Sequence, residues 1–261
     1  MAHLIEAQTP IALIPWCALA VISVVIPVRG DEHACARLLA ELAPYRGRQV
    51  EVLVVVAEDS KLPVPPHDPE AADEWLFCSP GRAKQLALGA ARARHGCLWF
   101  LHADTQNIAA AAQWLLRRCA QPQGSSGWGR FEVRFDDDRW LYKVVPWFMN
   151  WRSRLTSIAT GDQGIFVDRS LLETVGGWPQ QQLMEDVELC ARLRRHVRPS
   201  LPRRGDAPLV TSARRWRANG VLRTILLMWS LRLRYALGAD PATLHKTYYE
   251  DNQVAVEGCK Q

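Results

Sequence analysis

Short apolar runs alternate with helical segments along the first half of the chain. Residues 20–27 and 50–56 are uninterrupted runs rich in valine and isoleucine, as expected of buried parallel strands. A third short run, 97–101, predicts another strand, and the proline- and acid-rich segment 61–74 predicts an exposed loop. Helical spacing is found at residues 32–42, 85–94 and 109–119. This order predicts an α/β fold whose mainly parallel sheet is covered by helices on both faces.

The pattern becomes mixed after residue 121. Residues 127–135 and 164–167 have the composition of strands, while the tryptophan-rich segment 140–157 is either a helix or a loop. Two further segments, 185–195 and 221–237, have helical spacing. Because ligands of parallel sheets bind beyond the carboxyl ends of the strands, the polar residues that follow the predicted strands are the first candidates for chemistry.

Charge is concentrated near the end of the chain. The net charge is only +5, but twelve arginines and one acidic residue, Asp206, lie between Arg192 and Arg234. Such a block favours partners that carry phosphate, namely a nucleotide diphosphate, anionic lipid head groups or nucleic acid. No zinc-finger spacing, aromatic RNA-binding signature or basic heptad accompanies it, so nucleic acid ranks last and we expect no such partner.

The seven cysteines are scattered and form no CxxC pair, which favours a reduced, cytoplasmic setting. The apolar stretch 11–28 has Glu6 ahead of it, lacks a basic leading region and is broken by Pro15, so it does not resemble a signal peptide. We interpret its second half as a buried strand.

The last predicted helix raises the question of membrane contact. Its apolar run, 224–231, is bracketed by arginines and is shorter than the roughly 20 residues that a span requires. The helix either packs against the core or rests on an anionic membrane surface from the inner side. Arg223 and Arg234 fall near one stripe of it, whereas Arg232 does not.

His102 and Asp104 follow the third predicted strand. In extended backbone, residues two apart face the same way. A carboxylate suits Mg²⁺ or Mn²⁺, and a nearby imidazole favours Mn²⁺. The alternative is that Asp104, with Thr105, caps the next helix. The spacing alone supports both interpretations equally.

Glu185, Asp186 and Glu188 lie where a helix begins. Acidic residues in a first turn stabilise a helix without any catalytic role. The preceding turn, Gly176–Pro179, is however able to direct this helix start towards a cleft, where a carboxylate could take a proton from a hydroxyl group.

Two basic motifs suit anions. Gly81–Gln85 precedes a helix, and its backbone amides with Arg82 and Lys84 form a candidate anion site that is weak alone. Arg214–Arg217 combines fork-shaped donors with the indole of Trp216, which suits a diphosphate or a sugar ring. Without the other motifs we would interpret it as a solvated basic loop.

In their order, these motifs resemble family 2 glycosyltransferases of the GT-A fold, over roughly residues 22–235. The segments that carry the resemblance are Val24–Pro27 with Glu32, Phe100–Asp104, Val175–Trp178, Met184–Leu189 with Leu193, and Arg215–Trp216. A second set resembles a bacterial subgroup that is associated with radical-SAM proteins and labelled as arsenosugar-biosynthesis glycosyltransferases: Gly81–Gln85, Leu101–Thr105, Trp128–Phe131, Thr160–Gln163 and Arg214–Trp216.

The resemblance implies a Rossmann-type three-layer sandwich with a mainly parallel central sheet and a C-terminal helical extension. It implies inverting, single-displacement transfer from a nucleotide-diphosphate sugar to an unknown small-molecule or lipid acceptor, assisted by Mn²⁺ or Mg²⁺. The expected parts of this one integrated domain are an N-terminal extension, a donor-binding half, an acceptor half, and a C-terminal helix and tail, at residues 1–20, 21–120, 121–220 and 221–261.

The resemblance also assigns roles to residues. Asp186 would be the general base with Glu185 supporting it, and Asp104 would bind metal with His102 in place of the usual first acid. The expected donor-binding residues are Pro27, Glu32, Glu58, Arg82, Gln85, Asp104 and Arg215. The expected acceptor-binding residues are Trp128, Arg130, Asp162, Gln163 and Trp216.

Two positions depart from the family. The aspartate that usually follows the second strand and contacts the nucleobase of the donor is missing, and only Glu58 or Asp59 could substitute for it. Ala87 stands where asparagine is common. A degenerate nucleotide-sugar binding or scaffold protein is therefore the alternative. A nucleotidyltransferase ranks low, because residues 27–32 contain no glycine-rich phosphate loop.

Overall fold

The computed structural model describes residues 22–30, 32–60, 69–121 and 127–248. The predicted N-terminal extension, residues 1–20, and the end of the tail, residues 249–261, lie outside these ranges.

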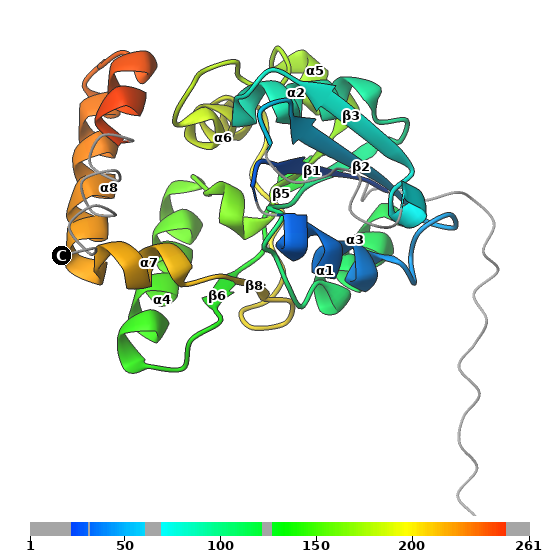
Figure 1. Ribbon diagram of the computed structural model, residues 1–261, viewed down its shortest axis with the longest axis horizontal. Helices are drawn as coiled ribbons and strands as arrows, with labels where there is room; N and C mark the ends of the chain where they lie inside the picture. The colour runs from blue at the N-terminus through cyan, green and yellow to red at the C-terminus, as the bar shows by residue number, and fades with distance from the viewer. Residues whose placement is uncertain (1–21, 31, 61–68, 122–126, 249–261) are drawn as a thin grey trace, which may run out of the picture.

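A six-stranded sheet with the order β3-β2-β1-β4-β7-β5 forms the centre of the molecule (Figure 1). The strands β3, β2, β1 and β4 run parallel, and β7 is antiparallel to both β4 and β5. Their bounds are β1 Ile22–Val28, β2 Val50–Ala57, β3 Glu74–Cys78, β4 Cys97–Phe100, β5 Trp128–Gly129 and β7 Phe166–Asp168. The predicted mixed α/β fold with a mostly parallel sheet is confirmed.

Helices cover the two faces of the sheet because successive side chains of each strand point to opposite sides. Val24 of β1 belongs to an apolar cluster with α1 (Glu32–Leu42) and α3 (Ala109–Cys119). Val25 belongs to a second cluster with α2 (Arg82–Arg92), α5 (Arg169–Thr174) and α6 (Glu185–His196). Gly89 lets α2 approach closely, because a Cβ there would lie 2.3 Å from Val25. The result is three layers.

Three segments differ from expectation. β3, which follows a short 3-10 turn at Pro69–Ala71, was not predicted, because four half-buried residues and one exposed residue at a sheet edge carry little pattern. The single strand predicted at 127–135 is two strands in different sheets, since β6 (Val133–Phe135) pairs with β8 (Leu209–Thr211). The basic loop at 214–217 is part of helix α7 (Arg214–Asn219).

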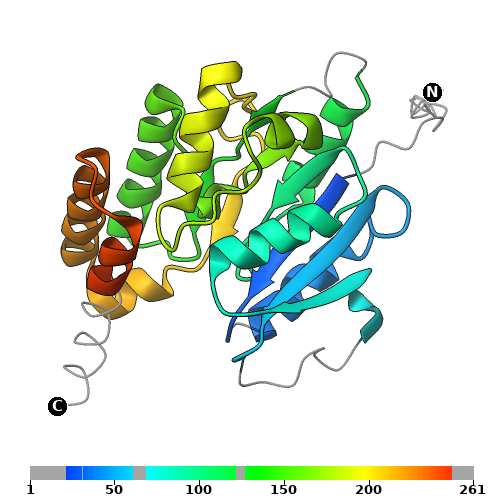
Figure 2. The same ribbon diagram turned by 90° about the horizontal axis from the view of Figure 1, so that it is seen from above.

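Helices α4 (Trp140–Thr156), α7 and α8 (Val221–Ala236) lie at the end of the molecule away from β2 and β3 (Figures 1 and 2). The segment 140–157, predicted as helix or loop, is therefore helical. α8 packs Leu231 against Met184 and Leu244, so one of its faces belongs to a small core. Among the described helices, none combines the length and the apolar character needed to cross a membrane.

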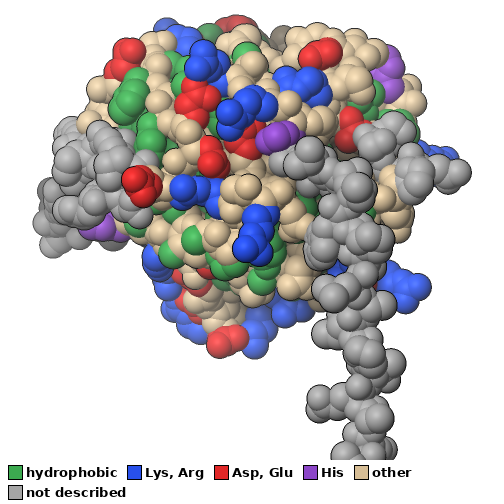
Figure 3. All heavy atoms as spheres, turned by 90° about the vertical axis from the view of Figure 1, so that its right-hand side faces the viewer, with side chains coloured by type: hydrophobic (Ala, Val, Ile, Leu, Met, Phe, Trp, Pro, Cys, Tyr) green, Lys and Arg blue, Asp and Glu red, His purple; other side chains and the backbone are tan. Residues whose placement is uncertain are grey.

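The opposite side of the molecule is polar. Figure 3 shows lysine, arginine and acidic side chains mixed over this face, with hydrophobic side chains only in small separate patches.

Candidate functional site

The candidate site lies at the carboxyl ends of the parallel strands, where ligands of such sheets bind. β1, β2 and β4 end there at Val28, Ala57 and Phe100. Just beyond them, Arg29 and Asp59 form an ion pair with a 2.7 Å contact, which joins the loops after β1 and β2. Asp59, one of the two residues that could replace the missing nucleobase-contacting aspartate, is therefore paired with Arg29.

Arg82, at the start of α2, connects two parts of the site. Its Nη1 lies 3.0 Å from Oε1 of Glu185, the first residue of α6. Burial alone would lower the pKa of Arg82, but the negative charges of Glu185 and Asp186 outweigh it and the pKa is raised. Burial raises the pKa of Glu185, Arg82 opposes that rise and Asp186 adds to it.

Two backbone amides fix the carboxylate of Asp186. The N–H of Gly161 donates to Oδ2 at 2.8 Å, and the N–H of Val187 donates to Oδ1 at 2.7 Å. The residue before the helix, Met184, is buried and has a φ of 63°, a conformation that a non-glycine residue rarely adopts. This turn directs the first carboxylates of α6 at the site.

His102 joins the same group of residues. Its Nδ1 lies 3.2 Å from Oδ1 of Asp162. Gly161 is packed between His102 and Arg82, because a Cβ at this position would lie 2.6 Å from His102 Nε2 and 1.7 Å from an Arg82 nitrogen. The structure therefore brings together five residues that the sequence singled out separately: Arg82, His102, Asp162, Glu185 and Asp186.

Asp104 lies in the turn that follows His102, with a half-buried side chain. Across the described part of the chain, no three His, Cys, Asp or Glu side chains gather in a way that could hold a metal ion. One carboxylate and one imidazole at this turn leave the other ligands of Mg²⁺ or Mn²⁺ to water or phosphate oxygens. This set fits a cation shared with a bound diphosphate and does not fit a closed structural metal site.

Four expected ligand-binding side chains are closed off from solvent: Gln85, Trp128, Arg130 and Gln163. Gln85 donates to the carbonyls of Val28 and Val55 at the ends of β1 and β2. Such contacts hold the ends of the two strands in place below the candidate site. The four side chains are buried in this structure, and their donor- and acceptor-binding roles stay predictions.

The supporting role is clearest for the other three. Trp128 donates to the carbonyl of Val197. Arg130 donates to the carbonyl of Asn150, and burial lowers its pKa to about 10. Gln163 donates to the Asn150 side chain and accepts from the N–H of Thr160, which fixes the turn that carries Asp162.

The remaining donor candidates are spread along the same edge. Pro27 is half-buried near the end of β1, and Glu58 is exposed directly after β2. Glu32 begins α1 and Arg215 lies in α7, but their side chains are outside what the structure describes. Their donor-binding roles stay predictions.

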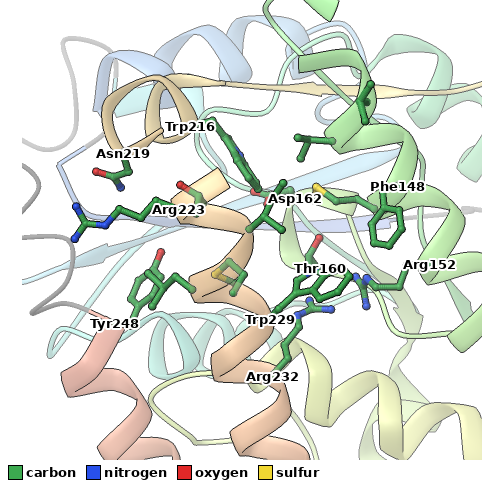
Figure 4. Close-up of a pocket in the computed structure, with 17 residues that line it drawn as sticks. Phe148, Arg152, Thr160, Asp162, Trp216, Asn219, Arg223, Trp229, Arg232 and Tyr248 are labelled. Atoms are coloured by element: carbon green, nitrogen blue, oxygen red, sulfur yellow. The ribbon is translucent and has the colours of Figure 1, made fainter. Parts of the chain in front are cut away.

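A pocket of about 360 Å³ adjoins the acidic group and lies between α4, α7 and α8 (Figure 4). Asp162 and Trp216 line it, as does Thr160. Three arginines that were not among the sequence candidates, Arg152, Arg223 and Arg232, also line it. The departure of Arg232 from the polar stripe of its helix is the one signal that could have pointed to it.

No protein-family model matches the sequence, and comparison with curated protein sequences gives no match. Solved structures do match. S. aureus TarS 1–349 superposes with a TM-score of 0.55 at 16% identity, covering 75% of this chain and 61% of that chain. The mannosyltransferase PcManGT from Pyrobaculum calidifontis, in complex with GDP-Man and Mn²⁺, gives 0.54 at 17% identity, covering 83% and 65%.

Glucosyl-3-phosphoglycerate synthase from Mycobacterium tuberculosis, in complex with Mn²⁺, UDP and glucosyl-3-phosphoglycerate, gives a TM-score of 0.53 at 15% identity, covering 74% of this chain and 70% of that chain. The match spans 36% of the longer S. aureus TarS chain. At these identities the likeness concerns the fold. The chain has the mixed α/β architecture, with a mostly parallel central sheet, of the GT-A glycosyltransferases.

Proposed function

We propose that the chain is a glycosyltransferase that moves a sugar from a nucleotide-diphosphate donor to an acceptor hydroxyl by a single inverting displacement. The observation that carries the proposal is the position of Asp186. It lies at a helix start beside the carboxyl edge of the parallel sheet, in contact with Gly161 and close to Arg82. Structures of the same fold hold GDP-Man or UDP together with Mn²⁺.

Asp186 is assigned as the general base. Both of its oxygens accept a backbone hydrogen bond, which fixes the orientation of the carboxylate. A carboxylate held in one orientation is suited to take the proton of an attacking hydroxyl. Glu185 is buried and paired with Arg82, so we assign it to positioning the helix start.

Asp104 and His102 would hold a divalent cation together with the donor diphosphate. The cation would supply charge neutralisation at the departing diphosphate. The pairing of His102 with Asp162 would orient the imidazole, as partners of metal-bound histidines usually do. Asp162 and Trp216 face the pocket and would bind the acceptor.

The test is turnover of a panel of UDP- and GDP-sugars with Mn²⁺, with donor binding measured separately by calorimetry. In Asp186→Asn we expect kcat to fall by about 10² to 10⁴ with donor affinity unchanged. Asp138→Asn, at a fully exposed aspartate, is the control.

In Asp104→Ala we expect the Mn²⁺ stimulation and most of the activity to be lost. Undiminished turnover in the Asp186 variant would contradict its role as general base, and undiminished Mn²⁺ stimulation in the Asp104 variant would contradict its role as metal ligand.

A second candidate is a nucleotide-sugar binding protein without transferase activity. It is favoured by the ion pair between Asp59 and Arg29, because Asp59 could otherwise have replaced the missing aspartate that contacts the nucleobase. Such a protein would bind a nucleotide-sugar but show no turnover in the same assay, and Asp186→Asn would change neither donor binding nor turnover.

A further inference from the structure

The pocket between α4 and α8 has a largely apolar lining. Its walls include Val145, Phe148, Met149, Ile225, Leu227 and Met228. Figure 4 shows side chains of α4 and α8 converging on it from two sides, with Trp216 of α7 closing a third. A volume of about 360 Å³ is enough for a small ligand or for part of a larger one.

Two of the three arginines that line the pocket point into this apolar space. Arg152 comes from α4 and Arg232 from α8, and Figure 4 shows both pointing into the pocket. Burial lowers the pKa of Arg152 to about 10, and the like charge of Arg232 adds to this effect. Burial also lowers the pKa of Arg232. Neither guanidinium group makes a hydrogen bond or an ion pair with any residue that the structure describes.

Acidic side chains nearby do not cancel this pair of charges. Asp186 acts on both arginines at a distance, but its two oxygens accept backbone hydrogen bonds. Asp162 lines the pocket and contacts His102. Two desolvated guanidinium groups side by side are unfavourable without an anion. A phosphate or carboxylate between them would make paired, charge-assisted hydrogen bonds.

The rim of the pocket is apolar and exposed. Val144 is 49% exposed and Trp229 is 56% exposed, and both line the pocket. Aromatic rings continue outward from it, since Phe148 stacks on Trp229 at 5.8 Å and contacts Trp151 at 5.7 Å. A hydrocarbon chain could therefore leave the pocket along this surface while remaining in contact with apolar groups.

From these observations we infer that the pocket binds an amphipathic anion, with a phosphate or carboxylate between Arg152 and Arg232 and a hydrocarbon part along Phe148 and Trp229. The inference rests on the proposed function in one respect, because it makes this ligand the class of acceptor that is presented to Asp186. It concerns recognition and adds no chemical step.

The test is calorimetric binding of decyl phosphate below its micellar concentration, without any nucleotide. We expect roughly tenfold or more weaker binding in Arg152→Gln and in Arg232→Gln. Arg234→Gln is the matched control, because Arg234 lies on the same helix but does not line the pocket. Inorganic phosphate alone and decyl maltoside, which has the same chain and no charge, should both bind more weakly than decyl phosphate.

Equal affinity of the wild type and both arginine variants, or of decyl phosphate and decyl maltoside, overturns the inference. Thermal unfolding of each variant shows whether it is folded, and Arg152→Lys, which keeps the charge, should retain part of the binding. The proposed function fails separately: arginine-dependent binding of decyl phosphate in a protein that binds no nucleotide-sugar would refute the transferase and leave the anion site in place. Turnover of nucleotide-sugars with arginine-independent binding would do the reverse.

Discussion

The central sheet and the layer formed by α4 and α8 both contain runs of large apolar residues, but only the sheet buries them. Every residue of β2 is buried. Among the described residues, the exposed large apolar side chains lie on α4 or α8, apart from Phe77, Val197 and Leu237. On each of these helices they recur at the same helical spacing: Trp140, Val144, Trp147, Trp151 and Leu155, and Leu222, Leu226, Trp229 and Leu233.

The difference shows that apolar spacing defines a helix face but not what covers it. α8 uses one face, with Leu231, to pack against Met184, and leaves the stripe with Leu226 and Trp229 open. Contiguous exposed apolar surface of this kind usually marks a site of interaction. The candidate site lies close to both regions. Arg82 of α2 is paired with Glu185 of α6, and Met184, which precedes α6, packs against Leu231 of α8.

Truncating one leucine in each region tests the comparison most directly. Leu53→Ala empties a fully buried position in β2 and should lower the free energy of unfolding by about 2–5 kcal/mol. Leu226→Ala removes the same atoms from a side chain that is 69% exposed, and should change it by less than about 1 kcal/mol. Urea denaturation of both variants gives the two values. Equal losses would mean that α8 is covered in solution.

The ion pair between α2 and α6, next to the place where α8 packs, should be the next most sensitive point. Arg82→Met leaves Glu185 buried without its cation, and breaking a buried pair usually costs about 3–5 kcal/mol. We expect about 2–4 kcal/mol here, because the Arg82 side chain is 34% exposed and Glu185 is buried. Lys84→Met, at an exposed residue of the same helix, is the control.

The pH dependence separates loss of the ion pair from loss of packing. Without Arg82, the pKa of Glu185 would rise further above its unfolded value. An acid with a raised pKa in the folded state destabilises the fold only once the pH exceeds the unfolded pKa, and most at high pH. The cost of Arg82→Met should therefore be smaller at pH 5 than at pH 8. A cost that does not depend on pH would identify packing as its source.

A buried charge within the sheet offers a third comparison. Burial raises the pKa of Asp168 in β7 to about 6, against the opposing effect of Arg118. Stability should therefore fall as the pH rises from about 4 through 6, because the unfolded chain ionises first. Asp168→Asn removes this fall. Relative to wild type, its free energy of unfolding should improve by about 2–3 kcal/mol between pH 4 and pH 7.5. Urea denaturation at both values, with Asp138→Asn as the control, measures it; a constant difference would contradict the assignment.

The local sequence pattern was enough to predict most of the long elements of the central sheet and the helices that cover it. The predicted helices 32–42 and 109–119 match α1 and α3, and the valine-rich strands match β1 and β2 within two residues. Each of these elements has a long apolar face of its own, so its sequence defines it. β5, β6 and β8 are two or three residues long, and they exist because distant strands pair with them. No local pattern encodes such pairing.

The candidate site divides in the same way. The sequence indicated that Arg82, His102 and Asp186 each bear chemistry, but not that Gly161 lies among them. That contact depends on how α2, β4 and α6 pack. The arginines of the α4/α8 pocket were not predicted either, because Arg152 lies among aromatic residues with no distinguishing neighbour.

Gly161 provides the smallest and most local test, and it concerns the packing around Arg82 of α2 at the start of α6. A Cβ there would overlap the guanidinium of Arg82 and approach His102. Because the Arg82 side chain can shift, we expect Gly161→Ala to cost only about 1–2 kcal/mol, while weakening the contact between Arg82 and Glu185. Gly96→Ala is the matched control, since a Cβ at Gly96 would meet nothing within 4 Å. In a double-mutant cycle with Arg82→Met, most of the Gly161 effect should disappear, because the atoms it displaces are then absent. Full additivity would mean that the close packing at Gly161 does not involve Arg82, and that other contacts hold α2 and the start of α6 together.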